Sequence, residues 1–415
     1  MNIIDYKLKL NSQSFSKNKR NIIILIRRSP GELDWIMPLL YSLRNKYNIF
    51  TIFRNAKTIN LLKNDKILFA LWNKTSFGYT VEPKLNSIIF RVGYFLFKRT
   101  ILGDFFKFKF QDNYYNASKI KNLIQDQTKT KYNFIPEAIF AEFINFSPWI
   151  NCFYNQNQLI KIIHFPHTSN IFGEKKLKIK NINKIKNRYL LLSNSYDVRH
   201  FQNKFLNSNI IEAGYLKYEK SWVKNYLVKK TKKTKKTKKI IYISYRGYNS
   251  SVMQLDKYVE QTIDIMDICT KIPNTMILFK IHPMTDRTEL LKILNLYSKK
   301  KWKLVNDSQI YLAKICDVYI AMFSTAAIMD GLGLKKTPIE LWNIFNEKNG
   351  KIRKSKFQSL NISLFVRNRS ELKNEIIHLL KLNRFDKRQF KIFQKFNKNF
   401  FINGSISYTK KIIGL

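Results

Sequence analysis

Residues 275–283 read TMILFKIHP, an apolar run that ends in a histidine and a proline. A run of seven mostly apolar residues is typical of a strand that is buried on both faces of a parallel sheet. The run ends in a histidine, His282, and Pro283 disfavours helical backbone at that histidine. The stretch therefore predicts a buried strand over 275–281 with an orientated imidazole at its carboxyl end.

Apolar runs alternate with amphipathic segments on both sides of this strand. Further strands are expected at 240–244, 302–305, 318–322 and 337–341, and helices at 253–269, 286–298, 308–313, 326–333 and 372–382. Regular alternation of strands and helices predicts a parallel sheet with helices on both faces. The second half of the chain is therefore expected to be a doubly wound α/β domain.

The first half shows the same alternation less clearly. Residues 21–26 (NIIILI) and 47–53 (YNIFTIF) read as strands, and the segment 32–45 between them has apolar residues at helical spacing. A strand, a helix and a strand in succession form a parallel βαβ unit. Additional strands are expected at 138–140, 159–164 and 189–193. The predicted fold class is α/β, with two doubly wound, Rossmann-like domains.

A charged tract separates the two halves. Residues 229–239 read KKTKKTKKTKK, which has no apolar surface to bury, and its like charges repel one another. We interpret it as a linker, although a tract that binds nucleic acid or lipid is the alternative. The expected division is a domain over 1–228, the linker, a second domain over 240–390, and a C-terminal segment over 391–415 that packs back on the first domain.

The formal net charge is +47, from 75 Lys and Arg against 28 Asp and Glu. Such a charge can attract a polyanion, either nucleic acid or an anionic lipid surface. It can also follow from base composition, because the chain is rich in Lys, Asn, Ile, Phe and Tyr and has only 12 Gly and 9 Pro. We favour composition as the larger cause. A nucleic-acid-binding protein is the weaker alternative, since the charge is spread along the chain without a recognition motif.

Cysteine usage and hydropathy indicate a protein of the cytoplasm. Cys152, Cys269 and Cys316 are widely spaced and predict reduced thiols rather than disulfides or a zinc site. The first twenty residues carry no apolar signal segment. The aromatic and basic stretch 88–110 is interrupted by charges, so it predicts an amphipathic helix that faces the core or rests on a membrane surface. We expect a cytoplasmic protein that can associate peripherally with the anionic inner membrane.

Polar residues follow three expected strands of the second half, at the edge where doubly wound sheets bind ligands. Arg246 and Gly247 follow 240–244, where they form either a phosphate contact or an ordinary turn. His282 follows the strand at 275–281 and suits a phosphate or a leaving group.

Ser324 and Thr325 follow the strand at 318–322 and precede a helix. Hydroxyl groups beside a helix N-terminus favour an anion site, although Ser and Thr also serve as plain helix caps. Glu340, at the end of the next strand, is a candidate acceptor for hydrogen bonds from a ribose or a sugar.

Two histidines near an apolar run of the first half are candidates for a general base. The sequence at 162–168 is IIHFPHT, and His164 or His167 can take a proton from an acceptor hydroxyl. Glu32 and Asp34, after the first strand, are rival bases. Carboxylates at a helix start also act as capping groups.

The two doubly wound domains, the His282–Pro283 pair and the Ser324–Thr325 pair resemble the two-domain (GT-B type) glycosyltransferases. Within these, the chain is similar to bacterial enzymes of capsule and lipooligosaccharide synthesis: sialyltransferases, Kdo transferases and CDP-glycerol glycerophosphotransferases. The resemblance is firmest over residues 190–345. It implies two domains facing a central cleft, with the acceptor on the first. The nucleotide donor lies on the second, where the two motifs bind its phosphate and nucleotide.

The resemblance has departures that concern the base. Sialyltransferases use an acidic-acidic-glycine motif, whereas residues 31–34 read GELD. The glycerophosphotransferases place a histidine in a Trp-His-Gly context, whereas residues 164–167 read HFPH. These families work without a metal held by an Asp-x-Asp motif, and no such motif stands near the strand ends. The resemblance therefore implies metal-independent chemistry and leaves the base open.

The leading prediction is a glycosyltransferase that needs no metal and no cofactor besides its nucleotide-sugar substrate. It moves a sugar from a CMP-, CDP- or UDP-linked donor to a surface polysaccharide or a lipid-linked acceptor. His167 or His164 is the expected base, and His282, Arg246 and the helix start at 324–327 stabilise the departing phosphate. A CDP-glycerol-type polyol-phosphate transferase and a nucleotide-sugar epimerase are the alternatives with the same fold.

Overall fold

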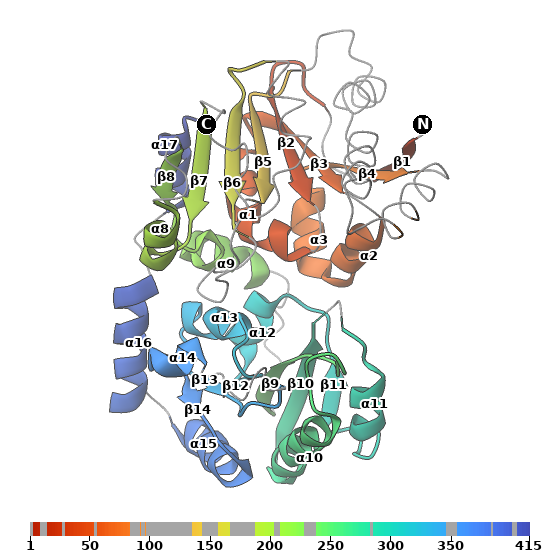
Figure 1. Cartoon of the computed structure of the whole chain (residues 1–415), viewed down its shortest axis with the longest axis vertical. Coiled ribbons are helices and arrows are strands. Elements are labelled where there is room, and N and C mark those ends of the chain that lie inside the picture. The colour runs from red at the N-terminus through yellow and green to blue at the C-terminus, as the bar shows by residue number, and fades with distance from the viewer. Residues whose placement is uncertain are drawn as a thin grey trace. The chain divides into compact units, whose positions relative to one another are not determined.

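The computed structural model describes the following parts of the chain: residues 3–8, 15–26, 30–53, 56–83, 92, 96, 135–142, 157–166, 187–202, 208–227, 238–282, 285–345, 355–382, 385–400 and 405–415. The chain forms two compact units, drawn in Figure 1. The first unit consists of Met1–Lys63, Leu68–Lys217 and Ile402–Leu415, and the second of Asn64–Ile67 and Tyr218–Phe401.

The first unit is built on an eight-stranded sheet in the order β1-β4-β3-β2-β5-β6-β7-β8. Its strands are β1 (Ile3–Leu8), β2 (Arg20–Ile26), β3 (Tyr47–Phe53), β4 (Phe77–Pro83), β5 (Ala138–Glu142), β6 (Lys161–Phe165), β7 (Arg188–Leu192) and β8 (Asn209–Glu212). Neighbouring strands are parallel except for β1 and β4. All residues of β3 are buried, as expected for a strand covered on both faces.

Helices described next to this sheet include α1 (Pro30–Leu43), α2 (Ala56–Asn64), α3 (Lys66–Asn73), α8 (Ser195–Gln202) and α17 (Ile406–Ile413). The C-terminal helix α17 belongs to the first unit and packs against α1. Gly414 ends α17 with a φ of 64°, a left-handed conformation that costs glycine little. Lys161 Nζ donates a hydrogen bond to the Gly414 carbonyl oxygen at 2.8 Å, which ties the chain end to β6.

The second unit contains an entirely parallel six-stranded sheet in the order β11-β10-β9-β12-β13-β14. Its strands are β9 (Lys239–Tyr245), β10 (Thr275–Ile281), β11 (Trp302–Leu304), β12 (Val318–Ala321), β13 (Pro338–Glu340) and β14 (Leu364–Phe365). From β9 the chain forms β10 and then β11 on one side, and then β12, β13 and β14 on the other side of β9. The boundary between β9 and β12 is therefore a topological switch point, where doubly wound sheets bind ligands.

The described helices of the second unit are α9 (Lys220–Leu227), α10 (Leu255–Lys271), α11 (Thr288–Leu294), α12 (Gln309–Ile315), α13 (Ala327–Gly333), α14 (Lys356–Ser359), α15 (Arg369–Lys381) and α16 (Lys387–Phe400). A 3₁₀ turn at Leu216–Tyr218 contains the point where the chain passes from the first unit to the second. Helix α10 packs against α11 and α15, whereas α12 packs against α9 and α13. Tyr218 fixes the start of this unit to α13, because its hydroxyl donates to buried Asp330 at 2.7 Å. A Cβ on Gly333 would lie 2.4 Å from the Tyr218 ring, so only glycine fits there.

The prediction of two doubly wound, Rossmann-like α/β domains is confirmed by these two sheets. The chain passes from the first to the second unit between Lys217 and Tyr218. Helix α9 is therefore grouped with α12 of the second unit, although it lies before the expected boundary at 228. The cleft between the domains stays a prediction.

Some expected features fall outside the described residues. These are Cys152, His167, Pro283, residues 229–237 of the Lys/Thr tract, and the segment 88–110 apart from positions 92 and 96.

Candidate functional site

Three loops of the second unit meet at the carboxyl edge of its sheet. The His282 N–H donates to the Tyr245 carbonyl oxygen at 3.0 Å, which joins the ends of β10 and β9. The Met322 N–H donates to the Ser244 carbonyl oxygen at 3.1 Å, which joins the ends of β12 and β9. The residues that follow these strands therefore lie side by side at the switch point.

Gly247 is held tightly in the loop after β9. Its N–H donates to Thr285 Oγ1 at 2.9 Å, and the Thr285 hydroxyl donates to the His282 carbonyl oxygen at 2.8 Å. A Cβ on Gly247 would lie 1.5 Å from the Asp286 carbonyl oxygen. The role of Gly247 is thus close backbone approach between the first two loops, which only glycine permits.

Arg246 stands at the end of the central strand β9 and is exposed. Its guanidinium has neither an ion pair nor a side-chain hydrogen bond among the described residues. Partial burial lowers the pKa of Arg246, but an arginine keeps its positive charge at neutral pH. The backbone beneath it is fixed, because the Tyr258 hydroxyl donates to the Arg246 carbonyl oxygen at 3.1 Å. An uncommitted cation on a fixed backbone at the switch point can receive an anionic ligand.

Ser324 has a left-handed backbone with a φ of 53°, which costs a non-glycine residue roughly 1–2 kcal/mol. Its N–H donates to Glu340 Oε1 at 2.8 Å, and this bond holds the strained turn. The hydroxyl groups of Ser324 and Thr325 are half-buried and make no hydrogen bond within the described chain. Helix α13 is capped by Ala326 without a side-chain bond, so neither hydroxyl serves as a helix cap. Both hydroxyls remain available to a ligand.

Glu340 is fully buried at the end of β13. Besides the Ser324 N–H, its carboxylate accepts a hydrogen bond from the Ser363 hydroxyl at 2.6 Å. Burial raises the pKa of this carboxyl above its usual value, against the lowering effect of its hydrogen bonds to Ser355, Ser363 and Ser324. Contact of Glu340 with a ribose or a sugar stays a prediction, and in the structure its side chain supports the Ser324 turn.

His282 is exposed immediately after β10, beside the Arg246 loop. The structure thus brings together Arg246, Gly247, His282, Ser324 and Thr325 along one edge of the sheet. Sequence reasoning missed Thr285, which links two of the loops through its hydroxyl. Its position three residues after His282 was the available signal.

The candidate bases of the first unit are placed differently. His164 is the fourth residue of β6 and fully buried, rather than standing past the strand. Burial, and then the charge of nearby Arg188, hold the pKa of His164 well below 6.5, so the ring is neutral. Glu32 is fully buried in the first turn of α1, and Asp34 pairs with Lys217 at 3.5 Å.

Glu142 was not predicted as a site residue. It ends β5, the neighbour of β2 across the switch point of the first sheet, and its side chain is buried. Its signal in the sequence was a carboxylate directly after the apolar residues 138–141. With Glu32, it places two buried carboxylates near the carboxyl ends of β2 and β5.

No group of three or more His, Cys, Asp or Glu side chains is arranged to hold a metal ion in the described part of the chain. None of the helices described is both long and apolar enough to cross a membrane.

Comparison with known proteins shows the fold of the chain. No family model matches the sequence, and neither does any curated protein. Among solved structures, a Listeria monocytogenes protein assigned as a UDP-N-acetylglucosamine 2-epimerase matches with 9% identity over 91% of both chains and a TM-score of 0.55. The UDP-GlcNAc 2-epimerase of Methanocaldococcus jannaschii matches with 12% identity over 95% of this chain and 99% of its own, with a TM-score of 0.52. S. aureus MnaA, in a co-structure with UDP, matches with 12% identity over 91% of both chains and a TM-score of 0.52.

Proposed function

We propose that the chain is an enzyme that binds a nucleotide-activated sugar at the carboxyl edge of its second sheet and transfers the sugar to an acceptor. One observation carries the proposal. The Arg246 guanidinium and the hydroxyls of Ser324 and Thr325 have no partners among the described residues, and they follow adjacent strands at a topological switch point. One uncommitted cation beside two uncommitted hydroxyls matches a diphosphate.

The chemistry of the site fits the departure of a nucleotide. When the bond between the sugar and the phosphate breaks, negative charge grows on the phosphate oxygens. Arg246 can donate charge-assisted hydrogen bonds to them, and the Ser324 and Thr325 hydroxyls can donate neutral ones. Hydrogen-bond donors beside the phosphate stabilise the leaving group as its charge develops. His282, exposed next to Arg246, adds positive charge when protonated.

The donor is best tested first as a uridine nucleotide. The solved structures that resemble this chain over 91% or more of their length include proteins named for UDP-N-acetylglucosamine and one in a co-structure with UDP. CMP- and CDP-linked donors remain open, because the described residues include no contact that selects a base. A surface polysaccharide or a lipid-linked glycan is the proposed acceptor, with His167 as the first base to test.

Epimerisation of the nucleotide sugar is the second candidate reaction. It is favoured by the names of the solved structures with the same fold. It requires the same donor site but no acceptor, so the two reactions are separable by one assay. Incubation with UDP-N-acetylglucosamine alone would yield an epimer under the second candidate, whereas transfer would release UDP only when an acceptor is added.

The binding site is tested by calorimetry with the nucleotide that gives the largest thermal shift among CMP, CDP, UDP and GDP. Arg246→Ala should weaken binding about 10- to 100-fold, the worth of a hydrogen bond to a charged group. The matched control is Arg367→Ala, since Arg367 is exposed in the same unit and pairs loosely with Glu371 at 3.9 Å. Equal affinities of Arg246→Ala and the wild type for the nucleotide would show that the nucleotide does not bind at this edge.

Ser324→Gly separates binding from stability. Glycine adopts the φ of 53° without backbone strain. This gain in stability is offset by the larger conformational entropy that glycine loses on folding, roughly 0.5–1 kcal/mol. The free energy of unfolding should therefore change little, while nucleotide affinity falls with the lost hydroxyl. Unchanged affinity would mean that Ser324 has only a structural role.

A further inference from the structure

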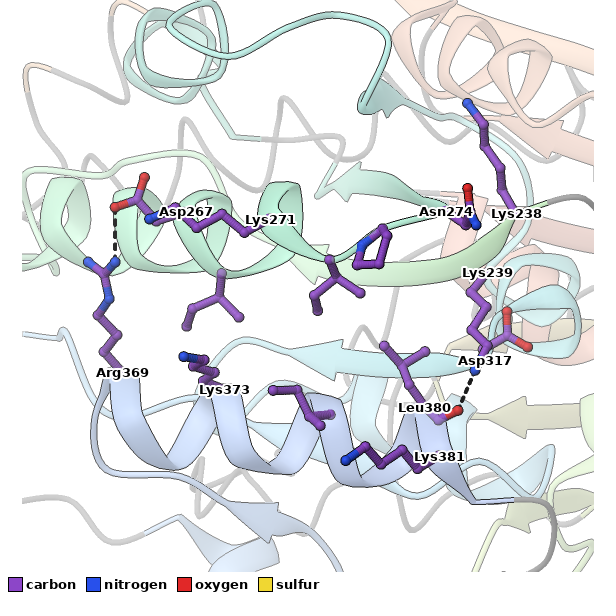
Figure 2. A pocket seen from close by; sticks show the side chains of 14 residues that line it. Lys238, Lys239, Asp267, Lys271, Asn274, Asp317, Arg369, Lys373, Leu380 and Lys381 are labelled. Atoms are coloured by element: carbon purple, nitrogen blue, oxygen red, sulfur yellow. Dashed lines mark hydrogen bonds and ion pairs between the residues drawn. The ribbon is translucent and has the colours of Figure 1, made fainter.

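A second pocket lies at the opposite, amino-terminal edge of the same sheet (Figure 2). It has a volume of about 910 Å³ and is walled by the last turns of α10 and by α15. Lys239 begins β9 at this edge, Asn274 precedes β10 and Asp317 precedes β12. The pocket is therefore separated from the proposed nucleotide site by the length of the strands, and both can be occupied together.

The charge of this pocket is strongly positive. Lysines from three segments line it, with Lys271 on α10, Lys373 and Lys381 on α15, and Lys238 before β9. None of these four makes an ion pair or a side-chain hydrogen bond among the described residues. In Figure 2, Lys271 and Lys373 come from the two helices that form opposite walls.

The acidic groups of the pocket are already engaged. Arg369 donates to Asp267 at 3.1 Å, and the Ile240 N–H donates to Asp317 Oδ2 at 2.7 Å. Lys239 Nζ donates to the Leu380 carbonyl oxygen at the end of α15. Lys271 also attracts Asp267 electrostatically. Six basic side chains against two carboxylates still leave the pocket with four excess positive charges, which favours an anionic partner.

The floor of the pocket is aliphatic. It is formed by Ile268, Ile272, Pro273, Ile377 and Leu380, and the described residues that line the pocket include no aromatic side chain. Single-stranded nucleic acids are usually held by bases that stack on aromatic rings. An aliphatic floor within a lysine rim instead matches a lipid, whose headgroup is anionic and whose interior is hydrocarbon.

The lysines are also spread too widely for one small anion. Lys373 and Lys381 are eight residues apart on α15, a separation of about 12 Å along the helix axis. Lys271 lies on the facing helix. A phosphate contacts cations within hydrogen-bonding reach, so these lysines match an array of headgroups better than one phosphate.

We propose that this pocket is where the protein docks on the anionic surface of a phospholipid membrane. Lys238, Lys271, Lys373 and Lys381 contact headgroup phosphates, and the aliphatic floor contacts the glycerol and upper acyl region. The proposal does not depend on the nucleotide site at the other edge. Docking through this edge leaves that site open to a substrate.

The test is co-sedimentation of the full chain with vesicles of phosphatidylcholine alone or mixed with phosphatidylglycerol. Binding should require phosphatidylglycerol and weaken with added salt, because exposed charges are screened. The variant Lys271→Gln/Lys373→Gln/Lys381→Gln should lower the partition coefficient about 100-fold, from roughly fivefold for each lysine.

A second triple variant, Lys257→Gln/Lys299→Gln/Lys300→Gln, is the matched control. It removes the same charge from exposed positions of the same unit outside the pocket, and should retain most vesicle binding. An equal loss in both triple variants would overturn the proposal in favour of diffuse attraction. Absence of binding to anionic vesicles would also overturn it, as would lysine-dependent binding of an oligonucleotide without vesicle binding.

The floor is tested separately with Ile377→Ser, which leaves the charge of the pocket unchanged. The Ile377 side chain is only half-buried, so the substitution should affect folding little. This variant should lose binding that survives at high salt, because contacts with hydrocarbon are not screened. Unchanged binding at high salt would overturn the assignment of the floor. Nucleotide affinity should remain at its wild-type value in all three variants, which verifies their folding.

Discussion

Replacing Glu340 by alanine should loosen the Ser324 turn and with it the nucleotide site. The Glu340 carboxylate accepts the Ser324 N–H at 2.8 Å and the Ser363 hydroxyl at 2.6 Å. A buried group that loses its partner costs about 1–3 kcal/mol. Glu340→Ala leaves both groups without this partner. Because water can reach the half-buried Ser324 and replace part of its lost hydrogen bond, the expected loss in the free energy of unfolding is about 2–4 kcal/mol.

Glu340→Gln is the matched variant. Its amide oxygen can accept the Ser324 N–H, and its amide nitrogen can donate to the Ser363 oxygen. The free energy of unfolding at neutral pH should therefore stay within about 1 kcal/mol of the wild type. Nucleotide affinity should fall roughly tenfold or more in Glu340→Ala, because the Ser324 hydroxyl is no longer pre-positioned, but little in Glu340→Gln.

The pH dependence gives an independent readout. Burial raises the pKa of Glu340 in the folded state, so the folded protein binds this proton more tightly than the unfolded chain. The contribution is complete below the ordinary pKa of glutamate and is lost as pH rises through the higher folded value. The stability of Glu340→Gln relative to the wild type should therefore increase with pH in that window.

Urea unfolding followed by circular dichroism, together with calorimetric titration of the nucleotide, measures both effects. Wild-type stability and affinity in Glu340→Ala would refute the role of Glu340 in holding the turn. So would equal losses of affinity in the alanine and glutamine variants.

Three further changes test other parts of the structure. Gly247→Ala places a Cβ 1.5 Å from the Asp286 carbonyl oxygen. It should lower the free energy of unfolding in urea by about 1–3 kcal/mol and weaken nucleotide binding. Wild-type stability and affinity would contradict the close approach of the two loops. Tyr218→Phe removes the donor to buried Asp330 and should cost about 1–3 kcal/mol, whereas a change below about 0.5 kcal/mol would argue against this bond. The pKa of His164 in the folded protein is held well below 6.5. The stability that the neutral ring contributes is therefore complete above pH 6.5 and is lost as pH falls through the folded pKa. His164→Gln should make the free energy of unfolding less dependent on pH below 6.5, and an unchanged slope would contradict a neutral, buried His164.

Much of the fold was predictable because strands covered on both faces read as continuous apolar runs. Residues 21–26 and 275–281 were placed as strands to within one residue. Strand β14, by contrast, has two residues, and β4 contains a glycine and a proline. Such segments are strands only because a neighbouring strand pairs with them, and composition alone does not reveal the partner.

The candidate site was predicted in place more than in detail. Arg246, His282 and Ser324 were chosen because they follow apolar runs, and the parallel sheet brings them to one edge. The role of Glu340 depends on partners 16 and 23 residues away, a relation that spacing does not encode. His164 lies inside β6 because the register with β5 extends that strand to Phe165.

Binding of a nucleotide at the carboxyl edge of the second sheet can be measured directly. Hydrogen exchange measured by mass spectrometry, with and without the nucleotide that stabilises the protein most, locates the site without relying on variants. We expect slower exchange in peptides covering 246–251 and 322–328, and unchanged exchange in those covering 268–274 and 373–381. Protection confined to other segments, or no stabilisation by any nucleotide of the panel, would contradict it.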